Sequence, residues 1–518
     1  MTRPALFLLA ALPVLAQQTG ALTGHLIDAA TKVPIPNATI KLPNTETTSN
    51  PQGQFHFPAL PPGAHRAIIT HPNYLRAEPP TITVTPATTT QFTAELTPYA
   101  QLAGRITSPN REPIPATFVG LRRPWDEAWI QTAATNADGR FHFRQLEPGT
   151  WILAALPGFG YTSSKPANSV KPLPDPEIPE EQNQRLGWAA TFYPNAANYT
   201  DAARIALLPG AQLDGYDIRL RTRTLRRITG TVLHADGTPA PKALLAISDP
   251  VNKGVNGQLV TAGANGRFEF LTASDGDWRL FGQHKRGDET AKGYTDVRVS
   301  RTDREDVELR LALPFPVTGM VEREEPRDSK GERKTTAIYL IPQGASADVQ
   351  TGTFHLQDGS FTLNQVYPAR YRVLPAGFVP GYYVESIWYG DRDVTTETIE
   401  ISNPPLPLRI VYKPKAGRAT GTIPRAAGHW AVLIPQDEAL RDAHQFIRRT
   451  AKCGPDGRFS IDSLRPGDYY AFAFDRVRTE QLEDIDFVRT LTIHATRTSI
   501  RPGETATLEL TPQPWPDY

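Results

Sequence analysis

The stretch that decides the fold reads Asn136-Ala137-Asp138-Gly139-Arg140-Phe141-His142-Phe143, followed by Leu146-Glu147-Pro148-Gly149-Thr150-Trp151. Asp138-Gly139 predicts a tight turn, because glycine tolerates the positive φ that closes a hairpin or a bulge. The two phenylalanines alternate with polar residues, which predicts a strand with one apolar face and one wet face. Pro148-Gly149 then reverses the chain, and a further strand begins at Trp151.

The same block occurs four more times in the chain. The other copies begin at Gln52-Gly53, Asn265-Gly266, Asp358-Gly359 and Asp456-Gly457. Their turn glycines are roughly a hundred residues apart, which is the spacing of small domains and not of a solenoid repeat of about 20–50 residues. The spacing therefore predicts five β modules in tandem.

Each module also opens and closes in a similar way. A glycine flanked by strand residues comes first, as in Leu22-Thr23-Gly24-His25-Leu26, and an alternating strand such as Ala506-Thr507-Leu508-Glu509-Leu510 comes last. Counting strands at intervals of about 8–12 residues gives about seven per module, enough for a two-sheet sandwich. A bulky ring stands two places after the glycine, or in module four the alanine, that ends each corner turn. His65 departs from the pattern of the other rings and is expected at a solvent-facing edge.

These patterns predict an all-β fold, a tandem array of about five Ig-like β-sandwich domains. Proline is abundant, with 49 residues of 518, which is typical of loop-rich β proteins. The expected boundaries are 17–98, 99–224, 225–313, 314–413 and 414–518, called modules one to five below. Module two is expected to carry a proline-rich insert near 163–184.

The first residues predict a signal peptide, residues 1–16. Arg3 gives a basic start, Ala5 to Leu15 forms a short apolar run, and Val14-Leu15-Ala16 suits cleavage before Gln17. The run is too short to span a bilayer, which needs about 20 residues. We therefore expect an exported protein without a transmembrane segment, located in the periplasm, at the cell surface or outside the cell.

The charge balance bears on the kind of partner, and the cysteine count bears on disulfide bonds. Lys and Arg number 55 against 54 for Asp and Glu, so no overall field attracts nucleic acid. Cys453 is the only cysteine, so no intrachain disulfide can form.

The repeated phrases resemble the carboxypeptidase regulatory-like domain. They are the G-x-[IVL] opening, the P-x-x-x-[VIF] strand and the D-G-x-F-x-[FIL]…L-x-P-G-x-[YW] block, best matched in modules one, two and five. Module three has Ser274-Asp275-Gly276 at the corner, and module four has Tyr367-Pro368-Ala369. The resemblance implies transthyretin-like sandwiches in an exported bacterial multi-domain protein, and related starch-binding-like sandwiches make carbohydrate contact a family-level expectation.

Motifs for catalysis are absent from the sequence. None of the 11 histidines has a glutamate three places on, as a zinc carboxypeptidase requires, and H-E-x-x-H, G-x-S-x-G and G-x-x-x-x-G-K do not occur. We therefore expect no enzyme activity, no catalytic residues, no metal and no cofactor.

The candidate recognition residues are aromatic, because exposed rings beside polar groups stack on sugars or anchor partners. The candidates are Trp125, Trp129, Trp188, Tyr193, Trp388 and Tyr389. The alternative is that these rings fill the cores of modules or contacts between modules.

Three functions fit the sequence. The first is a non-catalytic exported binding or scaffold protein, with a polysaccharide or a cell-envelope protein as partner. The second is an array of carbohydrate-binding modules, and the third is an enzyme with an unrecognised site between domains.

Overall fold

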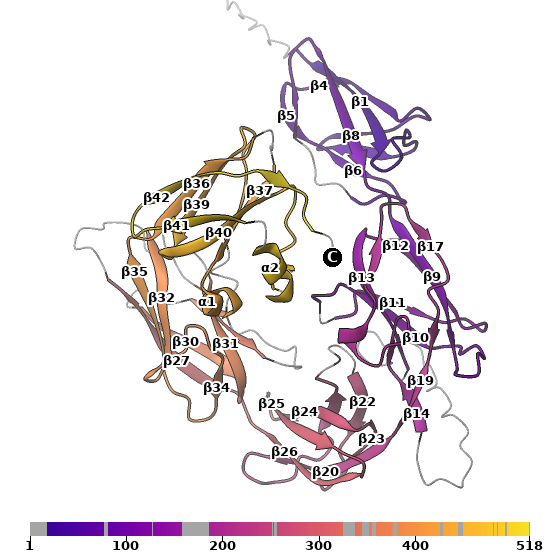
Figure 1. The fold of residues 1–518 in the computed structure, drawn as a ribbon, viewed down its shortest axis with the longest axis vertical. Helices are drawn as coiled ribbons and strands as arrows, with labels where there is room; N and C mark the ends of the chain where they lie inside the picture. Colours follow the sequence, from indigo (N-terminus) through magenta and orange to yellow (C-terminus); the bar gives the residue numbers. More distant parts are fainter. Residues whose placement is uncertain are drawn as a thin grey trace, which may run out of the picture. The chain divides into compact units, whose positions relative to one another are not determined.

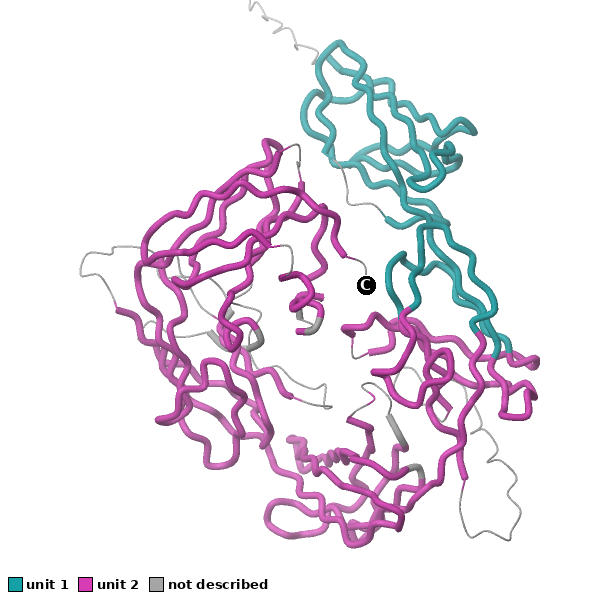
Figure 2. The backbone as a smooth tube through the Cα atoms, in the orientation of Figure 1, with its two compact units in different colours: residues 1–105, 140–151, 205–216 teal, residues 106–139, 152–204, 217–518 magenta. Residues whose placement is uncertain are grey.

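The computed structural model describes residues 18–76, 81–126, 128–157, 186–250, 252, 256–324, 337–343, 352–354, 359–376, 381–424, 428–443, 449–479, 481–483, 485–492 and 495–516. The expected signal peptide and the proline-rich insert lie outside these residues. The chain divides into two compact units, residues 1–105, 140–151 and 205–216 in one and residues 106–139, 152–204 and 217–518 in the other (Figure 2). The division falls within module two.

The chain is all-β, a tandem array of about five Ig/transthyretin-like sandwiches (Figure 1). In each module the opening strand is flanked by two partners within its sheet. It pairs antiparallel with the strand of the Asp-Gly block and parallel with a strand near the end of the module. The module boundaries themselves stay a prediction.

Module one contains three small sheets around one core. The sheets are β4 (Gln54–Leu60), β1 (Gly20–Asp28) and β8 (Thr89–Leu96); β3 (Thr45–Thr48), β2 (Thr39–Leu42) and β6 (Ile68–Thr70); and β5 (Gly63–Arg66) with β7 (Thr81–Val84). Leu22, Leu26, Ile40 and Phe55 lie in the core, so the alternation in β1 and β4 buries one face of each strand.

Module two has sheets in both units. In the first unit β12 (Arg140–Leu146) and β17 (Gln212–Leu213) flank β9 (Ala100–Thr107), and β16 (Ile205–Leu207) pairs with the start of β13 (Gly149–Leu156). In the second unit β11 (Gln131–Ala134), β10 (Phe118–Arg122), the remainder of β13 and β15 (Thr191–Phe192) form one sheet. The further elements there are β14 (Leu186–Ala189) paired with β19 (Arg221–Thr224), β18 (Ile218–Arg219), and the short helix η1 (Tyr199–Asp201).

The described residues of modules three and four form two sheets in each module. Module three has β23 (Arg267–Ala273), β20 (Arg226–His234) and β26 (Arg304–Leu311), and then β22 (Asn256–Thr261), β21 (Leu244–Ser248), β24 (Gly276–Arg286) and β25 (Glu289–Val299). Module four has β30 (Ser360–Val366), β27 (Phe315–Arg323), β35 (Leu408–Pro414), β32 (Tyr382–Tyr389) and β33 (Arg392–Asp393), and then β29 (Gly352–Phe354), β28 (Ala337–Pro342), β31 (Ala369–Ala376) and β34 (Ile399–Ile401).

Module five adds short helices to the sandwich. Its sheets are β39 (Arg458–Leu464), β36 (Gly417–Thr422) and β42 (Thr505–Glu509), and then β38 (Arg449–Lys452), β37 (Trp430–Pro435), β40 (Gly467–Phe474) and β41 (Thr496–Ile500), with β43 (Pro512–Gln513) beside β40. The helices are α1 (Glu438–Ala443), η3 (Gln481–Glu483) and α2 (Ile485–Leu491). Phe487 and Val488 of α2 join Phe472, Phe474 and Trp515 in a second core. Because this core covers the second face of β40, the last four residues of that strand are all buried and do not alternate between buried and exposed.

A glycine and a phenylalanine face each other at the centre of each first sheet. The cross-strand pairs are Gly24–Phe55, Gly104–Phe141, Gly230–Phe268, Gly319–Phe361 and Gly421–Phe459. A β-carbon placed on any of these glycines would lie 2.1–2.8 Å from the phenylalanine ring opposite, closer than van der Waals contact allows. The opening glycine is therefore required because the aromatic ring occupies the space of a side chain.

We expect Gly421→Ala to destabilise module five by about 1–3 kcal/mol, the usual cost of overpacking. The added carbon would lie 2.0 Å from the carbonyl oxygen of Leu508 and 2.8 Å from the Phe459 ring. Thr420→Ala, on the opposite face of the same strand, is the control and should change stability by less than about 0.5 kcal/mol. Calorimetric unfolding of the full chain measures both, and equal effects would contradict the packing argument.

Candidate functional site: the corners that join modules

In every module the corner that follows the Asp-Gly block, whether or not it is Pro-Gly, is closed by a hydrogen bond between a ring and a main-chain carbonyl four residues earlier. The pairs are His65 Nε2 with Pro61 O at 2.7 Å, Trp151 Nε1 with Glu147 O at 2.9 Å, Trp278 Nε1 with Ser274 O at 2.8 Å, and the hydroxyls of Tyr371 and Tyr469 with Tyr367 O at 2.9 Å and Arg465 O at 2.7 Å. His65 is half-buried and makes the same bond as the aromatic residues, so its role is to close the corner.

The strand that enters each corner carries a β-bulge. Its register against the opening strand shifts in all five modules. In three of them the bulge holds a residue at positive φ: Gln145 at 57°, Gln365 at 60° and Ser463 at 58°. A bulge leaves one residue without a partner in the hydrogen-bond ladder and bends the strand. Side chains at the bulge and at the corner can therefore contact groups outside their own sheet.

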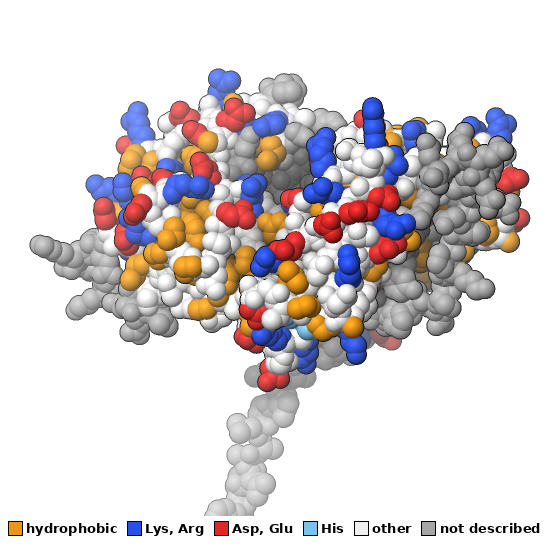
Figure 3. Space-filling view, turned by 90° about the horizontal axis from the view of Figure 1, so that it is seen from below, with side chains coloured by type: hydrophobic (Ala, Val, Ile, Leu, Met, Phe, Trp, Pro, Cys, Tyr) orange, Lys and Arg blue, Asp and Glu red, His pale blue; other side chains and the backbone are white. Residues whose placement is uncertain are grey.

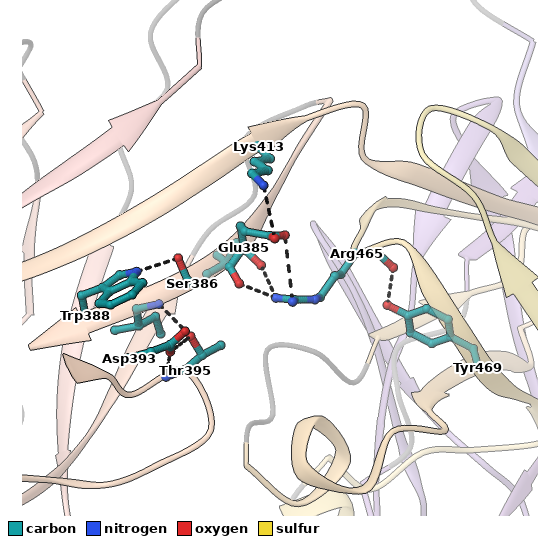
Figure 4. Close-up of polar contacts among 10 residues, drawn as sticks. Glu385, Ser386, Trp388, Asp393, Thr395, Lys413, Arg465 and Tyr469 are labelled. Atoms are coloured by element: carbon teal, nitrogen blue, oxygen red, sulfur yellow. Dashed lines mark hydrogen bonds and ion pairs between the residues drawn. The ribbon is translucent and has the colours of Figure 1, made fainter. Parts of the chain in front are cut away.

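The corner of module five binds module four through Arg465. Its Nη1 donates to the carbonyl oxygens of Val384 at 3.1 Å and Glu385 at 2.5 Å, and its Nη2 lies 3.9 Å from Oε2 of Glu385. Figure 4 shows Arg465 reaching from the corner toward Glu385 on β32. The side chains of Arg465 and Glu385 are only 26% and 29% exposed, so water screens this pair less than an ordinary surface ion pair.

The strand that accepts Arg465 is shaped for it. Val384 lies opposite Tyr412 and Ser386 opposite Val411, so Glu385 is the extra residue of a bulge between β32 and β35. The carboxylate of Glu385 also lies 3.4 Å from Nζ of Lys413. The bulge therefore supplies main-chain carbonyl groups outside the ladder, beside a carboxylate whose negative charge is opposite to that of the Arg465 guanidinium.

Two buried groups hold the corner itself. Nη2 of Arg449 donates to the carbonyl oxygens of Asp462 at 2.9 Å and Ser463 at 2.8 Å, which fixes the bulge. Burial lowers the pKa of Arg449 to about 10, so the guanidinium stays charged at neutral pH. Burial raises the pKa of Tyr469 to about 12, so its hydroxyl remains a donor to Arg465 O.

The corner of module four binds module three through Tyr367. Its hydroxyl donates to the carbonyl oxygen of Thr290 on β25 at 2.8 Å. The ammonium of Lys292 lies 5.3 Å from the centre of the Tyr367 ring, within the range of a cation–π contact. Since β25 is the last strand of its sheet, it has carbonyl groups that the ladder does not use.

Within the first unit, the bulge of module two contacts module one. Nε2 of Gln145 donates to the carbonyl oxygen of Pro72 at 3.0 Å. The linker runs beside the same loop, where the amide of Leu75 donates to Thr97 O at 2.8 Å and the amide of Tyr99 donates to Asn73 O at 3.0 Å.

Module three, whose corner lacks Pro-Gly, is joined differently. Its corner residue Asp275 accepts hydrogen bonds from Arg226 Nε at 3.1 Å and from the amide of Arg301 at 3.0 Å, both in module three. The linker instead supplies Arg223, whose guanidinium lies 5.5 Å from the centre of the Trp278 ring. Burial lowers the pKa of Arg223 against the opposing effect of nearby Asp249.

The predicted residue Trp129 lies in a packed cluster of module two. It is half-buried, and its ring centre is 6.4 Å from that of Phe192. The fully buried Arg122 places its guanidinium 4.9 Å from the Trp129 ring centre and 4.4 Å from that of Tyr199. The amide of Tyr199 in turn donates to Oδ1 of Asn252 in module three at 2.8 Å, so the cluster adjoins the connection between modules two and three.

Trp388 and Tyr389 lie on β32, the strand that receives Arg465. Trp388 is half-buried; its Nε1 donates to Ser386 Oγ at 2.9 Å, and the Arg409 guanidinium lies 4.6 Å from its ring centre. Tyr389 packs against the core of module four, and its hydroxyl accepts the amide of Leu406 at 3.1 Å.

The remaining three predicted residues are also half-buried. Trp125 lies in the turn after β10, Trp188 lies on β14, and Tyr193 follows β15. The amide of Tyr193 donates to Leu153 O at 2.9 Å. The six predicted rings therefore lie on several elements, and the ring contacts of Trp129, Trp388 and Tyr389 described above are made within their own modules.

The sequence reasoning missed the junction residues Gln145, Tyr367, Glu385 and Arg465. A signal was present for two of them. The residue before the corner proline differs from copy to copy within an otherwise repeated phrase: Pro61, Glu147, Tyr367 and Arg465. A position that varies within a structural repeat is free to contact something other than its own sandwich.

Titratable clusters are sparse in the described part of the chain. Among the residues described, no group of three or more His, Cys, Asp or Glu is placed to hold a metal ion. Cys453 is a free, buried thiol whose pKa is raised by burial.

No helix among the described residues is long and apolar enough to cross a membrane. On the face drawn in Figure 3, basic and acidic side chains are intermixed.

Residues 21–97 match the family model of the carboxypeptidase regulatory-like domain. This match confirms for module one the resemblance drawn from the sequence, so residues 21–97 form a domain of this class within the array of β-sandwiches. No curated protein matches the chain in sequence.

Several solved structures are similar over part of the chain. The Bacillus anthracis TIE protein is 10% identical with a TM-score of 0.18, over 57% of this chain and 51% of that one, so this chain spans about half its length. A streptococcal ancillary pilin is 11% identical with a TM-score of 0.19, over 57% and 99%. Two B repeat units of the collagen-binding protein of Staphylococcus aureus are 11% identical with a TM-score of 0.14, over 76% and 100%. Likeness at this level carries no inference about function.

We expect Tyr469→Phe to destabilise module five by about 1 kcal/mol, because the carbonyl of Arg465 loses its donor. The neighbouring Tyr470→Phe is the control, since Tyr470 is half-buried and points to the other face of β40. Thermal unfolding of the full chain compares the two variants. If both behave like the wild type, the corner bond does not stabilise the module.

Proposed function

We propose that this chain is a non-catalytic exported scaffold whose β-sandwiches are held in order by contacts from their corners. The observation that carries the proposal is the binding of Arg465 to the carbonyl groups of Val384 and Glu385 across the junction of modules four and five. Neighbouring domains of one chain move relative to each other by default unless their interface is strong. A junction held by a partly buried charge is a feature expected of a spacer or display protein.

The magnitude of the contact supports this role. Hydrogen bonds made by a charged group contribute about 1.5–3 kcal/mol, and Arg465 makes two of them to main-chain oxygens. The additional ion pair with Glu385 is long, at 3.9 Å, so it adds less free energy than the two hydrogen bonds. The total is enough to shift a mobile junction to a mostly closed one, since about 1.4 kcal/mol is a factor of ten.

The corners of modules two, four and five share one kind of acceptor. Gln145, Tyr367 and Arg465 all donate to a main-chain carbonyl of the preceding module. A main-chain carbonyl group is present whatever side chain the residue carries, so these three hydrogen bonds do not themselves depend on a particular side chain in the preceding module. This supports a general mechanism of array building in which only the donor changes.

Export and partners complete the proposal. The basic Arg3 and the apolar run from Ala5 to Leu15 support secretion through a signal peptide, to the periplasm, the cell surface or the exterior. We propose a cell-envelope protein as the partner of the displayed sandwiches.

Polysaccharide binding is a second candidate, and Trp388 favours it most. Its ring is half-buried and lies beside Arg409, a combination of apolar ring and hydrogen-bond donor that suits a sugar face. Trp125, Trp129, Trp188, Tyr193 and Tyr389 remain candidates on the same reasoning.

We expect Trp388→Ala to reduce retention on a bound polysaccharide at least about tenfold, since an aromatic anchor contributes about 2 kcal/mol or more. Retention is measured by affinity electrophoresis in cell-wall glycans, with a circular dichroism spectrum to check folding. Trp430→Ala, a half-buried ring of module five beneath Lys452, is the control. If the wild type is retained on none of the glycans, polysaccharide binding is contradicted and the scaffold function stands as the one proposal.

We expect Arg465→Ala to loosen the junction of modules four and five, so that trypsin cleaves the linker after Lys415, which follows β35, roughly tenfold to a hundredfold faster. Cleavage of a native chain follows the population of the open form, and the variant loses about 1.5–3 kcal/mol of contact. Arg458→Ala, which removes a side chain that is 77% exposed in the same module, should leave the rate unchanged. Equal cleavage of wild type and Arg465→Ala would overturn the scaffold proposal at this junction.

A further inference from the structure

The loop from His71 to Leu75 of module one is shaped by a histidine ring. Nδ1 of His71 accepts the amide hydrogen of Asn73 at 3.1 Å, and the carbonyl oxygen of His71 accepts the amide of Tyr74 at 3.2 Å. The first bond requires a neutral imidazole with its proton on Nε2, because a protonated Nδ1 is a donor and not an acceptor.

The same loop carries the contacts that join modules one and two within the first unit. Gln145 donates to the carbonyl oxygen of Pro72, and Tyr99 donates to that of Asn73, both at 3.0 Å. These two carbonyl groups belong to the residues inside the turn that the His71 ring closes. The geometry of the turn therefore decides whether both oxygens face module two.

The surroundings of His71 favour its neutral form. Burial holds the pKa of His71 below its ordinary value of 6.5. The ring of Tyr74 lies edge-on to it with centres 5.0 Å apart, and the Tyr74 hydroxyl donates to Oδ2 of Asp28 at 2.9 Å. Burial, together with this bond to Asp28, raises the pKa of Tyr74 to about 12, so the phenol stays neutral.

The groups that face the loop differ in charge. Asp28 is the carboxylate nearest to the Tyr74 side of the loop, and it also accepts the amides of Ala30 and Thr31 at 2.8 Å. Arg76 is exposed and follows the loop in the chain. From module two, Gln145 and Tyr99 reach the loop through uncharged donors.

We propose that His71 makes the junction of modules one and two sensitive to acid: protonation of Nδ1 ends its bond to the Asn73 amide, opens the turn and releases Gln145 and Tyr99. This inference rests on the proposed scaffold function and assigns a regulation to one of its junctions. The direction follows from the lowered pKa, since a group whose folded pKa is depressed stabilises the fold above the unfolded value and loses that contribution as pH falls. The junction is thus closed above about pH 6.5 and loosens below it.

The test is hydrogen exchange of the full chain at about pH 7.5 and about pH 5.5, a range that brackets histidine titration. Protection of the amides of Asn73, Leu75 and Tyr99 is compared after correction for the intrinsic rate at each pH. The wild type should lose roughly two- to tenfold protection at the lower pH, the factor that corresponds to one net hydrogen bond. In His71→Asn the side-chain oxygen accepts the amide two residues on, as in an Asx turn, and does not titrate, so its protection should not change with pH.

The outcomes separate this inference from the scaffold proposal. Strong protection of the wild type at both pH values would overturn the acid sensitivity and leave the scaffold intact. Weak protection of Tyr99 and Leu75 already at pH 7.5 would instead contradict a fixed junction here. An equal loss in wild type and His71→Asn would assign the effect to another group and overturn the role of His71. If His71→Asn does not fold, His71→Ser offers a hydroxyl acceptor for the same bond and is read in the same way.

Discussion

A phenylalanine ring lies across a glycine at the centre of every module, and the remainder of each sandwich is arranged around that contact. The ring needs the space of a missing side chain, and the glycine needs a neighbour to cover its exposed backbone. Because the two residues come from the opening strand and from the Asp-Gly block, their contact fixes the register between these strands. In module five, for example, Gly421 lies opposite Phe459, and the parallel strand β42 brings the carbonyl of Leu508 to within 2.0 Å of where a β-carbon would stand.

From that fixed register the chain continues into a bulge and a corner, and there the modules begin to differ. The ring that closes the corner is constant, since it donates to the same carbonyl position in every copy. The residue before the corner proline varies: it is proline in module one, tyrosine in module four and arginine in module five. In modules four and five this division lets one structural element serve two purposes: it closes its own sandwich with the constant ring and binds the preceding sandwich with the variable residue.

The fold could be predicted from the sequence because its signals are local. The turn glycines Gly53, Gly139, Gly266, Gly359 and Gly457 have φ between 71° and 87°, as the Asp-Gly pattern predicts, and the alternation of phenylalanines gives the buried faces. The family match to residues 21–97 agrees with the resemblance drawn from the same phrases.

The junctions could not be predicted, because they join residues far apart in the chain. Arg465 and Val384 are 81 positions apart, and nothing near Val384 indicates that a bulge frees its neighbour's carbonyl. The polar context of Trp129 favoured an exposed ring, yet Arg122, which belongs to that same polar stretch, is itself buried and lies close to the rings of Trp129 and Tyr199. The helices of module five were missed for a related reason, since α2 is only 7 residues long and is held by packing against β40 and not by its own periodicity.

The central claim, that corner contacts fix the order of neighbouring sandwiches, is tested most directly by the distance between modules four and five in solution. Spin labels at exposed positions, Asp391 in module four and Glu504 in module five, placed in a Cys453→Ser background, report that distance by pulsed electron resonance. The account predicts one narrow distance distribution for the otherwise unaltered chain. A broad distribution, as for two domains on a flexible linker, would contradict it.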